Sequence, residues 1–473
     1  MAALYPVAEL HYAQKRKLNI LSSIYQCFGE LKYCHVNPFG RKAICKYCVS
    51  RANSVSNQIN LQVIPITKII DEVNDNLIMG KIENSVMSSI ASITRISGRD
   101  ELMGSWLKVH ENLLNSSKYI YIFFKKQFEQ NLDELMMFNG RFCWDAAARF
   151  AAVNTKKNYI VYDFKKTNSY YEFKNISLHS IKENNERALK FYIENPIKAR
   201  KVANEFIESK IKGIPTYEKS YTELQQKNKI SINLDRNKKI ISVFPSSDDE
   251  YKYIGNEWGA EIIKSQPDEI RNLITNVDNK NYQIIIRMHP NMRGLSKKVL
   301  DSYLLLQKIF NNVYVLLPED ITSTYTLIDK SDYIICFCST VATEANYKGK
   351  KVICIGGSPY MKLPVANYVN SGTDAGKLIT NNAVRYGVKR ASIIWFYYLW
   401  KYEDKNDFII NEGNNNKYPF NFEINKPYFL RLFQAPFRAE IELRKPSKKN
   451  LDYLKRLFKS ILDIVFNKFS IKL

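Results

Sequence analysis

Two short segments of the chain place polar side chains directly after apolar runs. One is the stretch 287–291, Arg-Met-His-Pro-Asn, and the other begins at Cys338 and continues with Ser339 and Thr340. A Ser/Thr pair suits the first turn of a helix, whose free N–H groups bind anions, and the imidazole of His289 can donate to a phosphate oxygen. The chemistry that these residues offer is phosphate binding.

A third loop of the same kind follows the apolar run that ends at Phe244. It contains Ser246 and Ser247, again small hydroxyl side chains. The carboxyl ends of parallel strands lie on one side of a sheet, and ligands of open α/β sheets bind there. Three such strand ends within about a hundred residues favour one phosphate-binding crevice over three unrelated turns.

Each of these segments also has an ordinary structural interpretation. Ser339 and Thr340 can cap a helix whose Glu344 faces solvent, and His289 can be a hydrogen-bonded residue at a strand end. In a phosphate site, Glu344 lies about one turn further along the helix and can accept hydrogen bonds from ribose hydroxyls. The sequence leaves both interpretations open.

The elements that must position these residues predict α/β domains. Strand-like runs in the second half alternate with helix-compatible segments, which predicts a parallel, doubly wound sheet; the runs are 240–244, 283–288, 312–316, 332–337 and 351–355. A polar segment at 221–238 predicts the linker. We expect domains at 1–230 and 238–380, followed by a helical, basic extension at 381–473.

The first half of the chain predicts one βαβ unit. Its strand covers 134–138, a turn follows at 139–141, an alanine-rich helix runs over 142–153, and a second strand covers 159–164. The segment 178–212 is predicted to be helical.

Charge and hydropathy limit the possible partners. The 473 residues carry 70 Lys and Arg against 47 Asp and Glu, a net charge of +23, which implies attraction to polyanions. No arginine-rich tract, RNP-type sequence or helix-turn-helix signature favours nucleic acid. The longest purely apolar stretch, 393–400, is far shorter than the roughly 20 residues that span a bilayer, and the first residues do not resemble a signal peptide. We expect a cytoplasmic protein.

Two groups of segments resemble known sequences. Residues 284–291 and 331–356 resemble the donor-binding half of bacterial capsule and lipopolysaccharide glycosyltransferases of the GT-B fold, a group that includes the Kdo and sialic acid transferases. The segments 138–141 and 244–250 resemble capsule polysaccharide biosynthesis proteins. The resemblance implies two Rossmann-type domains facing a central cleft, with a CMP- or UDP-linked nucleotide sugar as the donor.

The resemblance also implies roles for single residues. His289, Ser339 and Thr340 would contact the donor phosphate, together with Ser246 and Ser247, and Glu344 would contact the ribose. A polysaccharide or lipid-linked glycan would be the acceptor. No Asp-x-Asp element is placed as a metal-dependent transferase requires, so we expect catalysis without a metal ion.

Residues of the βαβ unit are the candidates for the acceptor side. Arg141 follows a strand and a glycine, which suits a carboxylate on the acceptor or the donor. For Arg149, two turns further along, we favour solvent exposure. A transferase needs a group that takes the acceptor's proton, and Asp145 at the helix start is our candidate. Asp133, Glu134 and Asp163 lie nearby without a clear rank.

Four cysteines cluster near the start of the chain. Cys27, Cys34, Cys45 and Cys48 have the spacing C-x6-C-x10-C-x2-C, and four thiolates with one close pair can hold zinc or an iron–sulfur cluster. His35 can replace any of them. Reduced, partly buried thiols explain the pattern equally well.

The end of the chain predicts an amphipathic helix. An apolar stripe over 451–469 is surrounded by lysines, so this segment can lie on an anionic membrane surface or pack on the domain. Two further functions remain open: a nucleotide-sugar epimerase or polyol-phosphate transferase on the same fold, and a non-catalytic protein that binds polyanions or membranes.

Overall fold

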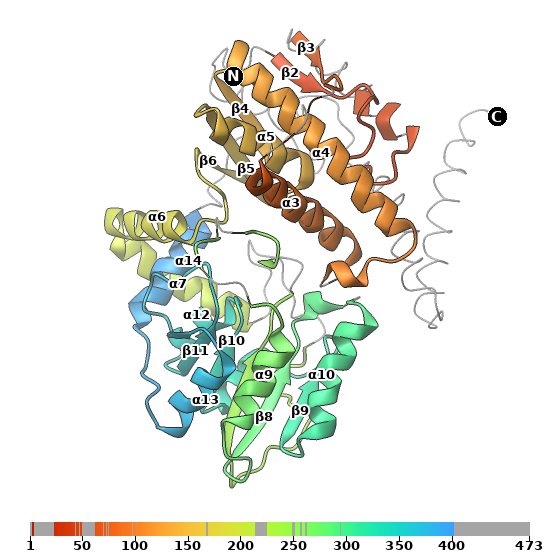
Figure 1. Cartoon of the computed structure of the whole chain (residues 1–473). Helices are drawn as coiled ribbons and strands as arrows, with labels where there is room; N and C mark the ends of the chain where they lie inside the picture. Colours follow the sequence, from red (N-terminus) through yellow and green to blue (C-terminus); the bar gives the residue numbers. More distant parts are fainter. Residues whose placement is uncertain are drawn as a thin grey trace, which may run out of the picture.

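The computed structural model folds into two α/β lobes that meet along one seam (Figure 1). It describes residues 2–3, 23–42, 44–46, 48–49, 62–69, 71, 73, 75–96, 98–166, 169–212, 225–247, 251–255, 258–260, 263–293 and 295–401. The predicted amphipathic segment at 451–469 lies outside the described residues. None of the described helices is long and apolar enough to cross a membrane.

The first lobe is built on a six-stranded sheet with the order β3-β2-β1-β4-β5-β6. All neighbouring strands are parallel except β5 and β6, which are antiparallel. The strands are β1 (Ala2–Ala3), β2 (Ser23–Gln26), β3 (Gln62–Pro65), β4 (Glu134–Phe138), β5 (Asn158–Lys166) and β6 (Ser169–Lys174). One large core lies between this sheet and the helices α3 (Asn76–Thr94), α4 (Ser105–Gln130) and α5 (Cys143–Asn154); the short 3-10 helix η1 (Arg99–Glu101) connects α3 and α4.

The second lobe contains an all-parallel sheet with the order β12-β11-β10-β7-β8-β9. Its strands are β7 (Lys239–Phe244), β8 (Tyr282–Arg287), β9 (Val313–Leu316), β10 (Tyr333–Cys336), β11 (Lys351–Ile355) and β12 (Asn367–Val369). The five strands predicted for this half of the chain are present, each within two residues of its predicted bounds. The continuous apolar runs form these strands because both faces of the sheet are covered.

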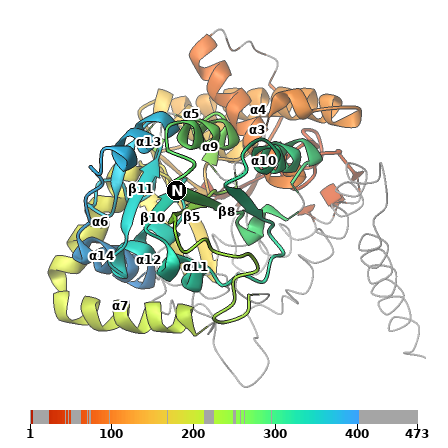
Figure 2. The same cartoon turned by 90° about the horizontal axis from the view of Figure 1, so that it is seen from below.

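Helices cover the two faces of the second sheet from opposite sides (Figure 2). One face packs against α9 (Gln266–Thr275), α10 (Lys297–Ile309) and α13 (Gly372–Thr380). The other face packs against α7 (Pro196–Ile211), α11 (Thr324–Lys330), α12 (Val341–Tyr347) and α14 (Lys389–Lys401). The short 3-10 helix η3 (Pro290–Met292) follows β8. The predicted α/β fold class with two Rossmann-type domains is confirmed.

The boundary between the lobes differs from the expected one. The predicted helix at 178–212 is two helices, α6 (Ile181–Glu194) and α7, because Asn195 ends the first and caps the second and Pro196 cannot continue a helix. Both pack with α14, and Phe206 of α7 lies in the core of the second sheet. We therefore propose a boundary near residue 178 in place of residue 230. Part of the predicted extension, α14, also belongs to the second lobe.

Candidate functional site

The three phosphate-binding loops predicted from the sequence end three neighbouring strands. Strand β7 lies between β10 and β8, and all three are parallel. Their carboxyl ends therefore lie on one edge, and the loops with Ser246, His289 and Ser339 are neighbours there. The strand order also reverses between β7 and β10, since the chain runs outward from β7 to β9 and then returns to β10. Such a switch point opens a crevice at the carboxyl edge.

His289 directly follows Met288 at the end of β8, at this edge of the sheet. Its Nδ1 accepts a hydrogen bond from the backbone N–H of Asn291 at 3.0 Å. Burial, together with the smaller effect of the charges of Arg287, Lys210 and Arg95, lowers the pKa of His289 to about 4. The imidazole is therefore neutral near pH 7, and because Nδ1 accepts, we assign the proton to Nε2.

Arg287 is structural. Its guanidinium donates to three backbone carbonyls, those of Met288, Leu317 and Asp320, at 2.7 to 3.1 Å. These bonds tie the end of β8 to the loop after β9. Burial lowers the pKa of Arg287.

Arg95 reaches this edge from the first lobe. It follows α3 in the left-handed conformation, with φ 65°. Its guanidinium donates to the Ser247 hydroxyl at 3.3 Å and to the backbone carbonyl of Asn291. One arginine thus connects the first lobe to two of the three loops. The motif-based prediction missed it, because nothing in the sequence near Arg95 marks a ligand site.

Glu344 differs from the expected solvent-facing carboxylate. It is buried, with 4% of its surface exposed. The Tyr325 hydroxyl donates to Oε2 at 2.8 Å, and the Lys210 ammonium lies 3.6 Å from Oε1. The expectation of a solvent-facing carboxylate is therefore wrong, whereas the role of ribose ligand stays a prediction. Glu344 holds Lys210, which the sequence did not single out.

The loop after β10 combines a strained backbone with the two hydroxyl residues. Cys338 has φ 54°, a conformation that side-chain-bearing residues rarely adopt and that is concentrated at functional sites. The Ser339 hydroxyl accepts from the backbone N–H of Val341 at 3.4 Å, and the Tyr360 hydroxyl donates to the Ser339 carbonyl at 2.5 Å. Thr340 occupies the N-cap position of α12 without a side-chain cap bond.

A pocket opens beside these loops, between the ends of β7, β10 and β11. Its wall is largely aromatic and apolar, with the residues Ser246, Tyr251, Lys252, Trp258, Ile263, Gln266, Phe337, Cys338, Ile355 and Gly357. Gln266 fixes one side, because its amide bonds both the N–H and the carbonyl of Ser246. A Cβ on Gly357 would lie 2.2 Å from Nε1 of Trp258, so only glycine fits under the indole.

The edge of the first sheet carries the second group of predicted residues. Asn139 and Gly140, with φ 54° and 74°, form the tight turn after β4. Arg149 donates from Nε to the Gly140 carbonyl at 2.9 Å and is 4% exposed, so the expectation of solvent exposure was wrong. Arg141 follows the turn, with its guanidinium 4.8 Å from the centre of the Phe142 ring.

Asp145 lies in the first turn of α5, at the same edge. The side chain is buried, with 3% exposed. Burial and the nearby Asp145 carboxylate contribute to raising the pKa of Cys143 to about 12. A carboxylate near a helix N-terminus is stabilised in its charged form. Asp133 and Glu134, in contrast, form ion pairs with Lys157 and Lys174.

Comparison with known proteins follows this geometry. The family model described as "Capsule polysaccharide biosynthesis protein" matches residues 200–364. This segment, about a third of the chain, is similar to that family. The match confirms the predicted resemblance to capsule polysaccharide biosynthesis proteins. No match was found among curated proteins.

Several solved structures are similar to the chain at low identity. KpsC of Thermosulfurimonas dismutans, a beta Kdo 2,7 transferase, has 15% identity and a TM-score of 0.35, over 59% of this chain and 79% of that chain. The UDP-GlcNAc 2-epimerase of Neisseria meningitidis has 12% identity and a TM-score of 0.27, over 85% and 99%. MurG of Acinetobacter baumannii has 8% identity and a TM-score of 0.26, over 86% and 95%.

The capsule-synthesis segment contains most of the donor-side residues described above. Lys210, the loops after β7, β8 and β10, and the aromatic pocket all fall within it. Arg95 and the residues at the edge of the first sheet lie outside it.

The four N-terminal cysteines line one pocket of the first lobe, beside Trp144. Three of their sulfurs accept hydrogen bonds, Cys27 from the N–H of Gly29, Cys45 from the Asn37 amide and Cys48 from the Gln26 amide. Burial raises the pKa of the Cys27 and Cys34 thiols. The donor set suits zinc, but no three or more His, Cys, Asp or Glu side chains among the described residues are placed to hold a metal ion.

Proposed function

We propose that this protein is a glycosyltransferase that binds the diphosphate or phosphate of a nucleotide-sugar donor at the carboxyl edge of β10, β7 and β8. The observation that carries the proposal is the neutral His289 in the field of Lys210 and Arg95, with Arg95 also bonded to the Ser247 hydroxyl. A phosphate here accepts a hydrogen bond from Nε2 of His289 and lies in the field of two cations. Ser246, Ser339 and Thr340 supply hydroxyls at the same edge.

The aromatic pocket is the proposed place of the nucleobase. It adjoins the Ser246 and Cys338 loops, and its Tyr251 and Trp258 rings lie 5.7 Å apart. A base can pack against these rings, while Gln266 holds the Ser246 backbone in place. Whether the base is cytosine or uracil decides between a CMP-linked and a UDP-linked donor.

The proposed chemistry is transfer of the sugar with the nucleotide as leaving group. Negative charge develops on the leaving phosphate, and Nε2–H of His289 with the ammonium of Lys210 stabilises it, without a divalent ion. The first lobe presents the glycan acceptor, with Arg141 binding an acidic group and Asp145 as the base that takes the hydroxyl proton.

Nucleotide binding and product analysis test this function. In isothermal titration, CMP, CDP or UDP binds the full-length protein, and one base is preferred. A nucleotide sugar is then consumed only when a glycan acceptor is present. Conversion of the free nucleotide sugar without acceptor would identify an epimerase instead. Tight, steeply salt-dependent binding of DNA or RNA with no response to nucleotides would contradict an enzymatic donor site.

Arg95→Ala should weaken nucleotide binding by about tenfold, which corresponds to the roughly 1.4 kcal/mol of one charge-assisted hydrogen bond. The physical reason is that Arg95 supplies a cation and orders the loops of Ser247 and Asn291. The measurement is titration of the preferred nucleotide. Arg99→Ala is the matched control, because Arg99 lies on the same lobe but is exposed and pairs with Glu83. Equal weakening in both variants would show a general charge effect.

We further propose that zinc or an iron–sulfur cluster draws the four thiols together when it binds, because they line one pocket although they are not placed to hold a metal ion in this structure. When bound, the metal would crosslink the loop after β2 through Cys27, Cys34, Cys45 and Cys48. Purified protein should then contain zinc or iron by mass spectrometry, and Cys45→Ser with Cys48→Ser should lose it. Cys354→Ser, a buried thiol of the second lobe, should keep it. Metal-free wild-type protein that folds normally would remove this proposal.

A further inference from the structure

The first lobe contains a cluster of basic side chains that the donor site does not use. His35 comes from the loop after β2, Arg141 from the loop after β4, and His179 from the segment before α6. Nδ1 of His35 and Nε2 of His179 are buried ring atoms that have no hydrogen-bond partner within the described ranges. Two such atoms in one region require an explanation, because nearly all buried polar atoms in proteins are paired.

Arg141 is the common neighbour of the two histidines. The His35 ring stacks on the Phe142 ring with centres 4.0 Å apart, and the Arg141 guanidinium lies 4.8 Å from the centre of the same ring. Burial lowers the pKa of both His35 and His179, the charge of Arg141 lowers it further in each, and Arg149 acts on His179 as well. The two histidines are therefore neutral and share the field of the Arg141 guanidinium.

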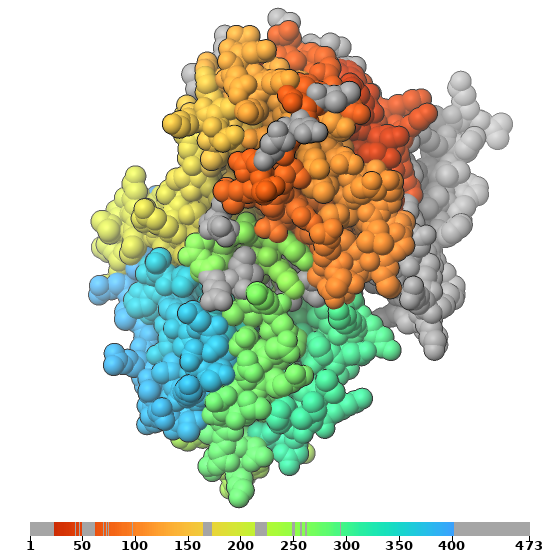
Figure 3. Space-filling view, in the orientation of Figure 1, coloured from red at the N-terminus to blue at the C-terminus, as the bar shows by residue number. Residues whose placement is uncertain are grey.

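His179 lies at the seam between the lobes. Leu178, just before it, packs in the core of the first lobe. Ile181, two residues after it, packs with Trp258 and Cys338, which line the donor pocket. The basic cluster thus lies across the seam from the proposed donor site. Figure 3 shows the two lobes in contact along this seam, which the ion pair of Lys298 with Asp100 also bridges.

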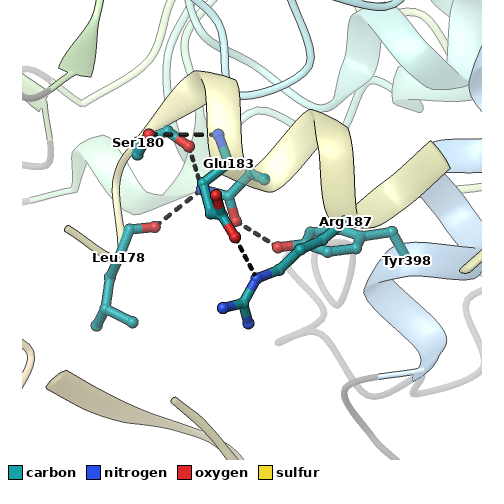
Figure 4. A network of polar contacts seen from close by, with 6 residues as sticks. Leu178, Ser180, Glu183, Arg187 and Tyr398 are labelled. Atoms are coloured by element: carbon teal, nitrogen blue, oxygen red, sulfur yellow. Dashed lines mark hydrogen bonds and ion pairs between the residues drawn. The ribbon is translucent and has the colours of Figure 1, made fainter. Parts of the chain in front are cut away.

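The backbone on both sides of His179 is held in place (Figure 4). The Asn184 amide donates to the carbonyls of Leu178 and Ser180 at 2.9 and 2.7 Å, and the Tyr398 hydroxyl of α14 donates to its Oδ1. The Ser180 hydroxyl caps α6, accepting from the N–H of Glu183 at 3.3 Å. The backbone at His179 is therefore held in place and is not part of a flexible linker.

An oxyanion explains these observations together. A carboxylate or phosphate oxygen accepts hydrogen bonds from imidazole N–H groups and from a guanidinium, and the Arg141 charge favours an anion over a neutral group. A buried nitrogen without a partner is destabilising, so a ligand that pairs both rings regains this energy.

We propose that His35, Arg141 and His179 form a second anion site, on the first lobe, that binds a carboxylate or phosphate carried by the acceptor glycan. The inference rests on the proposed function, because it places the anion opposite the donor. It adds two histidines to the acceptor side and makes an acidic acceptor the preferred substrate class.

Saturation-transfer NMR of the full chain with three probes tests the site. Methyl glucuronide carries a carboxylate, glucose 6-phosphate a phosphate, and methyl glucoside neither. We expect transfer to at least one acidic probe and none to methyl glucoside. The acidic probe that binds identifies the source of the anion. Equal transfer to the acidic and neutral sugars would overturn the proposal.

Variants separate this site from the donor site. Arg141→Gln and His179→Phe should each lower the affinity for the acidic probe at least tenfold. Arg99→Gln, which removes an exposed charge of the same lobe, should leave this affinity unchanged. Wild-type affinity in Arg141→Gln and His179→Phe, with thermal unfolding unchanged, would overturn the inference. The probe should still bind in His289→Asn. If nucleotides fail to bind wild-type protein while the acidic probe binds, the proposed function fails and this site stands.

Discussion

His289→Asn is expected to weaken nucleotide binding by about 10- to 100-fold, the roughly 1.5–3 kcal/mol of a hydrogen bond to a charged group. Asparagine can still accept the N–H of Asn291, as Nδ1 does, but it lacks a donor at the position of Nε2. The transfer rate should fall by about 10²-fold or more, because the lost donor stabilises charge on the leaving phosphate. Isothermal titration and single-turnover kinetics measure the two effects.

His289→Gln is the matched control. Its amide nitrogen reaches the position of Nε2, so it should restore part of the affinity and rate that His289→Asn loses. If the two variants behave alike, and equally close to wild type, His289 is only a strand-end residue. If both lose binding together with thermal stability, the Nδ1 hydrogen bond matters for folding more than for the ligand.

Glu344→Ala is expected to lower the free energy of unfolding by about 3 kcal/mol, since it leaves the mostly buried Lys210 ammonium without its ion-pair partner. The Tyr325 hydroxyl loses its acceptor as well. For a lobe of this size the midpoint of thermal unfolding should fall by roughly 6–12 °C. Calorimetry or circular dichroism measures the shift.

The double variant Glu344→Ala with Lys210→Met shows whether the pair is the cause. Removing both charges should recover a large part of the lost stability, because no buried charge then remains unpaired. Nucleotide affinity should still be low, because Lys210 is absent from the phosphate site. If the Glu344→Ala protein has normal stability but binds ribonucleotides weakly, Glu344 is a ribose ligand and not a structural partner of Lys210.

The sequence alone was sufficient to predict the second sheet and the edge of it that carries the proposed donor site. Runs such as Ile284–Ile286 have no polar residue, so they form strands only where both faces are covered, and parallel strands end on a common edge. His289, Ser246 and Ser339 therefore meet because of local pattern and general topology. The turn at Asn139 and Gly140 was equally predictable, since both residues tolerate positive φ.

The tertiary structure alone decided which distant residues join these edges. Arg95 lies 152 residues from Ser247 in the chain, and Lys210 lies 134 residues before Glu344, with no local pattern linking either pair. The apolar faces of α6 and α7 fit either lobe by hydropathy, and only packing against α14 assigns them to the second. Local sequence fixes backbone conformation and burial within an element, whereas contacts between elements depend on shape and charge brought together by the whole fold.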